Sequence, residues 1–271
     1  VQSNGTFLSS IKPAELKSKI DIHPSHTIKC IQIQAKLVNV KTAPYLIEYC
    51  HIRPEVIKQM RGLVKKYFTG EESYHLALLL ADYMLVNNNH SNSYTSVSKT
   101  ILSVLSPKLV VQACFALALK FLEPITDYPG LLSHLYDSDP ELRECELVCL
   151  SLLEYKLDWM TPYGILEFYL GFGIFFEKEI QSSVSTTSFK STQTISVLDK
   201  VESAHQLCYN ILNFVVSDLR SLEFRPEQIV FSIITIVRDQ FKVKQKWHPN
   251  FTKLFTVKFE DFEECYKIIN K

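Results

Sequence analysis

Apolar residues recur at three- and four-residue spacings along most of the chain. This is the pattern of helices that bury one face, whereas the alternation typical of strands is rare and glycine is scarce. The pattern predicts an all-α protein. The expected helices cover about residues 27–38, 54–68, 72–85, 109–122, 141–156, 162–176, 196–219, 226–240 and 259–270.

One of these helices, 109–122, is apolar on nearly every face, so we expect it to be a central helix surrounded by others. Pro107 precedes this run, and Pro226 likewise precedes a second long apolar run that continues through 233–237. Two similar stretches of this kind predict a faint internal repeat, with two helical units each built around one buried helix.

The predicted division of the chain follows from this repeat. An N-terminal extension with a helix covers 1–50, a first repeat of about five helices covers 51–160, and a second covers 161–271. Two stretches rich in Asn, Ser and Thr, 87–108 and 181–194, are expected to be solvated loops.

Composition narrows the class of protein. Hydrophobic residues make up 46% of the 271 residues, charged residues 21%, and the formal net charge is zero. A nucleic-acid partner is not expected, because phosphate binding needs a basic surface. A membrane span is not expected either, because the longest apolar run is shorter than the roughly 20 residues that a bilayer requires. Seven scattered cysteines without a C-x-x-C motif favour a reducing compartment, nuclear or cytoplasmic.

Catalytic chemistry finds little support in the sequence. The glycines lack the spacing of a phosphate-binding loop, and no H-E-x-x-H motif occurs. His205 and Cys208 lie three residues apart on a predicted helix, but the further ligands that a zinc site needs are not evident. We therefore expect no catalytic, cofactor-binding or metal-binding residues, and no enzyme activity.

Four charged residues stand against apolar runs. Arg53 and Asp82 belong to neighbouring predicted helices, Lys120 ends the most apolar helix, and Glu146 lies within the apolar stretch 145–150. A buried charge is costly without a partner, so each must be paired internally, be paired across an interface, or extend to water. Opposite charges at the rims of two adjacent helices favour an interface for Lys120 and Glu146.

The segments that carry these charges resemble the cyclin family over residues 52–170, and more loosely over 196–271. The resembling motifs are Ile52-Arg53, Leu76-Ala77, Asp82-Tyr83-Met84-Leu85, Leu109, Ala116-Leu117-Ala118-Leu119-Lys120-Phe121-Leu122-Glu123, Glu146-Leu147-Val148-Cys149-Leu150, Tyr155-Lys156-Leu157 and Met160-Thr161-Pro162. The family's five hallmark positions are filled by Arg53, Asp82, Leu109, Lys120 and Glu146. The spacing is similar to that of D-type cyclins.

The resemblance implies a cyclin fold and a regulatory subunit that activates a cyclin-dependent Ser/Thr protein kinase, as in the cell cycle. Lys120 and Glu146 would contact the C helix of the kinase. Apolar anchors around them would be Phe121, Leu150 and Tyr155. Arg53 and Asp82 would form an internal ion pair between the first two helices of the repeat.

Two departures from the family are informative. The positions that form the family's docking patch for Arg-x-Leu substrates read Ile52, Glu55, Val56 and Gln59, so we expect a degraded patch. In the second repeat Asp239 stands roughly where the first has Lys120, so only the first repeat is expected to bind a kinase in this way.

Three alternatives remain open from the sequence. One is a cyclin-fold protein that resembles a transcription-factor core, which the zero net charge disfavours. Another is a scaffold that keeps the fold without activating a kinase. An all-helical enzyme is the third, although the sequence offers no site for one.

Overall fold

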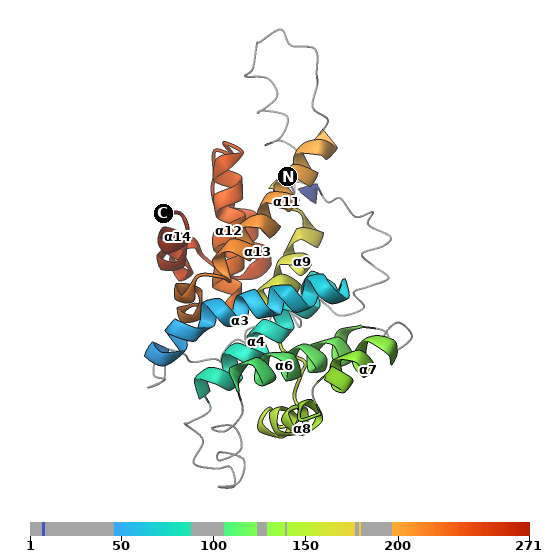
Figure 1. Cartoon of the computed structure of the whole chain (residues 1–271). Helices are drawn as coiled ribbons and strands as arrows, with labels where there is room; N and C mark the ends of the chain where they lie inside the picture. The colour runs from blue at the N-terminus through green and yellow to red at the C-terminus, as the bar shows by residue number, and fades with distance from the viewer. Residues whose placement is uncertain are drawn as a thin grey trace. The chain divides into compact units, whose positions relative to one another are not determined.

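A computed structural model of the chain describes residues 7–8, 46–87, 106–123, 129–138, 140–176, 179 and 197–271. The chain forms two compact units, Leu37–Thr161 and a second that contains Pro162–Lys271 (Figure 1). The expected helix at 27–38, the loop at 181–194 and most of the loop at 87–108 lie outside the described residues.

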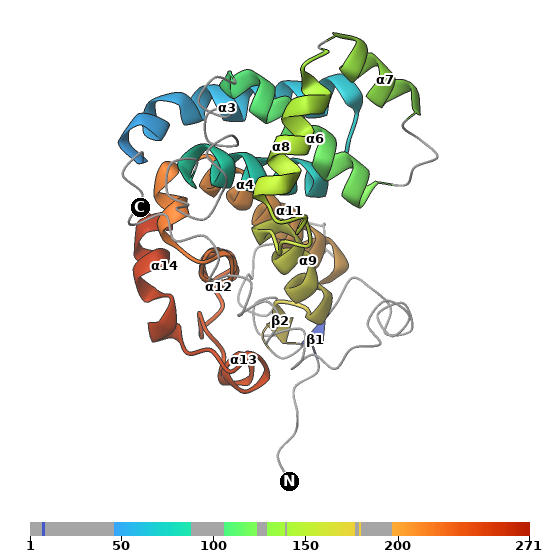
Figure 2. The same cartoon turned by 90° about the horizontal axis from the view of Figure 1, so that it is seen from below.

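The first unit is a group of helices around one central helix. Helix α6 packs against α3, α4 and α8 (Figures 1 and 2). Between Leu109 and Leu119 every residue of α6 except Gln112 is buried, as the apolar pattern predicted. The helices of this unit are α3 (Leu46–Tyr67), α4 (Glu71–Asn87), α6 (Pro107–Leu122), α7 (Pro129–Ser138) and α8 (Leu142–Leu152).

Helix α6 begins where its sequence predicts. Ser106 is the N-cap, and its hydroxyl oxygen accepts a hydrogen bond from the backbone N–H of Leu109 at 3.3 Å. Pro107 takes the first helical position, where its missing N–H has no intrahelical partner to lose. The start of the central helix is therefore encoded locally.

The bounds of α3 differ from the prediction. It begins at Leu46 and carries Pro54 in its interior, whereas the sequence pattern predicted a start at Pro54. An interior proline costs a helix about 3 kcal/mol. The turns before it bury Tyr49, 1% exposed, and Arg53, 2% exposed, and this burial offsets the cost.

The second unit repeats the arrangement. Helix α12 packs against α9, α11 and α14, and all its residues from Ile229 to Arg238 are buried (Figure 2). The prediction of a second buried helix at 226–240 is confirmed. The helices of this unit are α9 (Pro162–Phe172), α11 (Val197–Val215), α12 (Pro226–Gln240), α13 (Pro249–Phe255) and α14 (Glu263–Ile269), with short 3₁₀ turns at Leu219–Glu223 and Phe259–Asp261.

The predicted helix at 162–176 is too long. Helix α9 ends at Phe172 because Gly173 adopts a left-handed backbone, with φ of 84°, which suits glycine at a helix end. Strand β2 (Phe175–Phe176) follows and pairs antiparallel with β1 (Phe7–Leu8), Phe7 opposite Phe176. With two-residue strands as the only sheet among the described residues, the all-α prediction is confirmed.

Aromatic rings hold α13 in the second unit. Trp247 lies at its start and contacts Phe251, Phe231 and Phe262, with ring centroids 4.9 to 5.4 Å apart. Phe251 and Phe255 stack at 5.7 Å. Aromatic pairs at these separations add to the burial energy, which explains how a seven-residue helix is held in place.

Candidate partner-binding site

Lys120 and Glu146 meet where α6 packs against α8. The distance from Lys120 Nζ to Glu146 Oε1 is 2.5 Å. The Lys120 side chain is 39% exposed and that of Glu146 is 11% exposed. The pair is therefore formed within the first unit, with its ammonium group at the rim and its carboxylate mostly buried.

A third residue, Tyr136 from α7, completes this site. Its hydroxyl donates to Glu146 Oε2, so both carboxylate oxygens of Glu146 accept a hydrogen bond. The Tyr136 ring also lies beneath two cations, with its centroid 5.1 Å from Lys120 Nζ and 5.1 Å from Arg143 Cζ. Cations at this distance are attracted to an aromatic face. Tyr136 was not expected here because the sequence pattern predicted no helix over Pro129–Ser138.

The site keeps Lys120 charged. Partial burial opposes the charged form, but the hydrogen bonds to Glu146 and Tyr136 and the negative charge of Glu146 outweigh it and raise the pKa of Lys120. An ammonium group has three N–H donors, so a partner's carbonyl or carboxylate oxygen can still be bound beside Glu146. Charge-assisted hydrogen bonds of this kind are short and strong.

Exposed apolar side chains follow both charged residues along the chain. Phe121, next to Lys120, is 49% exposed, and Leu147, next to Glu146, is 66% exposed. Leu150 lies one helical turn beyond Glu146 and is half-buried. Leu147 was not among the residues expected here, because an apolar run does not reveal which of its members faces solvent.

Tyr155 is held in an unusual backbone conformation. Glu154 and Tyr155 have φ values of 51° and 58°, a left-handed region that bulky residues rarely adopt. The hydrogen bond from Tyr155 N to Leu150 O, at 3.0 Å, closes this turn directly after α8. The turn leaves the Tyr155 side chain outside the core, at 73% exposure.

Arg53 and Asp82 form an ion pair inside the first unit. Two contacts of 3.0 Å join them, Nε to Oδ1 and Nη2 to Oδ2, and their side chains are 2% and 5% exposed. Tyr49 also donates its hydroxyl to Asp82. These contacts join α3 to α4 in the interior, so the pair serves stability.

We expect Arg53→Ala to lower the free energy of unfolding by about 3 kcal/mol, because it leaves the Asp82 carboxylate buried without its cation. Urea unfolding followed by circular dichroism measures this. Lys58→Ala on the same helix is the control, since Lys58 is 80% exposed and pairs with Glu55 at the surface. Equal unfolding midpoints for Arg53→Ala and the unsubstituted chain would contradict the assignment.

The surface of α3 that matches the family's substrate-docking patch is polar. Ile52 is 37% exposed, whereas Val56 is buried and contributes no surface. Glu55 is exposed and contacts Lys58 at 3.5 Å. The Gln59 amide donates to Glu55 at 3.4 Å. An apolar peptide side chain would have to displace these charged and amide groups.

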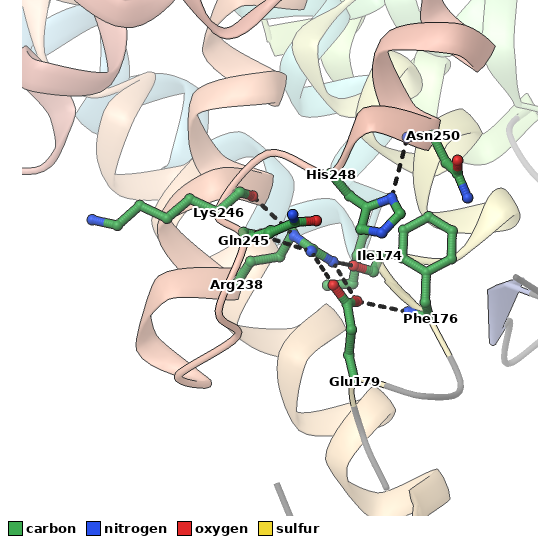
Figure 3. A network of polar contacts seen from close by, with 8 residues as sticks. All are labelled: Ile174, Phe176, Glu179, Arg238, Gln245, Lys246, His248 and Asn250. Atoms are coloured by element: carbon green, nitrogen blue, oxygen red, sulfur yellow. Dashed lines mark hydrogen bonds and ion pairs between the residues drawn. The ribbon is translucent and has the colours of Figure 1, made fainter. Parts of the chain in front are cut away.

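The second unit contains a buried cation that the sequence analysis did not identify. Arg238, at the end of α12, is 0% exposed, and all five of its N–H groups donate (Figure 3). Its acceptors are Ile174 O at 2.5 Å, Glu179 Oε1 and Oε2 at 2.7 and 3.0 Å, Gln245 O at 2.7 Å and Lys246 O at 2.9 Å. This network joins the segments after α9 and after α12, and it leaves no donor for a ligand.

The described part of the chain also bears on the predictions for a metal site and a membrane span. His205 and Cys208 are both buried on α11. Over the residues that the structure describes, no three His, Cys, Asp or Glu side chains group as a metal site. The same residues include no helix with the length and apolar character needed to cross a bilayer.

A comparison with protein families identifies the class of this two-unit helical protein. Residues 184–271 match the family described as cyclin, C-terminal domain. The C-terminal part of the chain therefore carries a cyclin C-terminal domain. No curated protein matches the chain significantly. The matched region contains α11 to α14, whereas Lys120 and Glu146 lie in the first unit.

Proposed function

We propose that this chain is a regulatory subunit that binds and activates a cyclin-dependent Ser/Thr protein kinase through the Lys120–Glu146 site. The observation that carries the proposal is the ion pair at the α6–α8 rim, with an exposed fraction of Lys120 and exposed apolar side chains beside it. The match of residues 184–271 to the cyclin C-terminal domain supports a regulatory role rather than a catalytic one.

The proposed mechanism needs no catalytic group from this chain. Lys120 binds oxygen atoms at the C helix of the kinase, while Phe121, Leu147 and Tyr155 fill apolar positions around it. Because the ion pair is already formed in the free chain, little side-chain ordering is required on binding. Movement of the C helix completes the kinase's own Lys–Glu pair and orders its activation loop. The chain thus shifts a two-state equilibrium in its partner.

Among the described residues of the second unit, no lysine stands at the position that corresponds to Lys120. Asp239, roughly where the first repeat has Lys120, pairs with Lys246 at 2.8 Å, and both side chains are well exposed. A carboxylate there would repel the oxygen atoms that Lys120 is proposed to bind. We therefore assign kinase binding to the first unit alone.

Substrate choice in this proposal does not depend on Arg-x-Leu motifs. Glu55 and Gln59 make the α3 surface polar, so an Arg-x-Leu peptide should show no saturable binding at micromolar concentrations in fluorescence polarisation. The double substitution Glu55→Leu with Gln59→Trp should introduce binding by restoring apolar side chains. Micromolar binding to the unsubstituted chain would contradict the proposal.

Affinity purification from nuclear and cytoplasmic extracts, followed by a kinase assay, tests the proposed function. We expect a proline-directed Ser/Thr kinase to co-purify and its activity to rise with added chain. A partner that binds without any change in kinase activity would instead support a scaffold. Sequence-specific DNA recovery would support a transcription-factor-like role.

A further inference from the structure

Tyr136 contacts both members of the Lys120–Glu146 pair, Glu146 through its hydroxyl and Lys120 through its ring. We propose that Tyr136 is a positioning residue that holds Glu146, and through it Lys120, in the arrangement that a partner binds. The expected effect of Tyr136 on kinase binding rests on the proposed function. Its effect on the Lys120–Glu146 pair concerns the free chain alone.

Glu146 accepts a hydrogen bond at each of its two carboxylate oxygens. Lys120 occupies one carboxylate oxygen and Tyr136 occupies the other, on a side chain that is only 11% exposed. Without the Tyr136 hydroxyl, Oε2 would be mostly buried with its donor gone, which is unfavourable for a carboxylate. Glu146 would then rotate toward water and separate from Lys120.

The Tyr136 ring also interacts with Lys120. Lys120 lies over it with Nζ 5.1 Å from the centroid, so the ring attracts the ammonium group. The Glu146 carboxylate, which the Tyr136 hydroxyl holds, attracts the same ammonium group. The Tyr136 hydroxyl therefore acts on Glu146, and the Tyr136 ring acts on Lys120. Substitution by Phe removes the hydrogen bond to Glu146 and keeps the ring beneath Lys120.

Helix α7 fixes Tyr136 in place. The preceding residue, Leu135, is 1% exposed and anchors α7 in the core of the first unit. His134 lies against Tyr67 of α3, with a Tyr67 Oη to Nδ1 distance of 3.4 Å. The phenol is thus presented by a helix with its own anchors, so loss of the hydroxyl alone should not displace α7.

The first test measures the free chain. Carbon-13 NMR of reductively methylated lysines reports the pKa of Lys120, with the resonance assigned by its absence from Lys120→Arg. In Tyr136→Phe we expect this pKa to fall toward the ordinary lysine value, because Lys120 loses the contribution of the Tyr136 hydroxyl and Glu146 no longer stays beside the ammonium group. The control is Tyr209→Phe, which removes a similar hydroxyl–carboxylate bond, to Glu167 in the second unit, and should leave the Lys120 pKa unchanged.

The second test measures binding to the kinase that co-purifies with the unsubstituted chain. Tyr136→Phe should weaken it about tenfold, the effect of losing one hydrogen bond to a charged group. In a Glu146→Gln background the same substitution should cause no further loss, because the carboxylate that it positions is gone. A purely structural role would give the same loss in both backgrounds.

The outcomes separate this inference from the proposed function. An unchanged Lys120 pKa in Tyr136→Phe overturns the positioning role, whether or not a kinase binds. A lowered pKa with undiminished kinase affinity overturns its consequence for binding. If the unsubstituted chain binds no kinase, the proposed function fails, and the Lys120 pKa still decides whether Tyr136 positions the pair.

Discussion

Replacement of Lys120 and Glu146 together by Ala is expected to lower the affinity for the kinase at least about 100-fold while the chain stays folded. Truncation of hydrogen-bonded charges in an interface costs about 2–5 kcal/mol, and about 2.8 kcal/mol corresponds to 100-fold. Removal of both residues avoids leaving either charge unpaired in the fold. Calorimetric titration with the purified kinase measures the affinity, and urea unfolding checks the fold.

The matched control removes a Lys–Glu pair from elsewhere. Lys267 and Glu263 pair on α14 at 2.7 Å, with side chains 64% and 41% exposed. Their joint replacement by Ala makes the same change in charge and should leave kinase affinity unchanged. If both double substitutions weaken binding equally, the effect is not specific to the proposed site.

Arg238→Met is expected to lower the free energy of unfolding by about 3–5 kcal/mol, the range for loss of one partner from a buried ion pair. Met fills much of the same space but has no donors. The substitution therefore leaves the Glu179 carboxylate and the carbonyl oxygens of Ile174, Gln245 and Lys246 without their shared donor (Figure 3). Urea unfolding monitored at 222 nm measures the loss.

An exposed arginine provides the comparison for Arg238. Arg220 pairs with Asp218 at 2.6 Å, but its side chain is 59% exposed, so Arg220→Met should leave the unfolding midpoint nearly unchanged. An Arg238→Met chain as stable as the Arg220→Met chain would show that the buried network does not stabilise the second unit.

The parts of the fold that could be predicted are those with a long periodic signal. Helix α12 has the predicted bounds, and α6 is buried on nearly all faces, because each presents several turns of apolar residues after a proline. Helices α7 and α13, with 10 and 7 residues, were missed because so few turns carry little periodicity. Their places depend on contacts with other elements.

The residues of the candidate site also differ in how far the sequence alone reveals them. Lys120 and Glu146 could be noticed because each charge stands in an apolar stretch. Tyr136 could not be noticed, since nothing local links a tyrosine on a short helix to a carboxylate ten residues later. Arg238 is preceded by a strongly apolar run, but a basic residue at a helix end ordinarily faces solvent. Its burial depends on Glu179, 59 residues earlier in the chain.

We have proposed that this chain activates a kinase through the Lys120–Glu146 site. The most direct test is the rate of peptide phosphorylation by the purified co-purifying kinase, measured as the chain is titrated in. We expect a saturable rise with the unsubstituted chain and no rise with the double substitution Lys120→Ala and Glu146→Ala. Full activation by the doubly substituted chain would show that the Lys120–Glu146 site is not needed, and no activation by the unsubstituted chain would show that it does not activate this kinase.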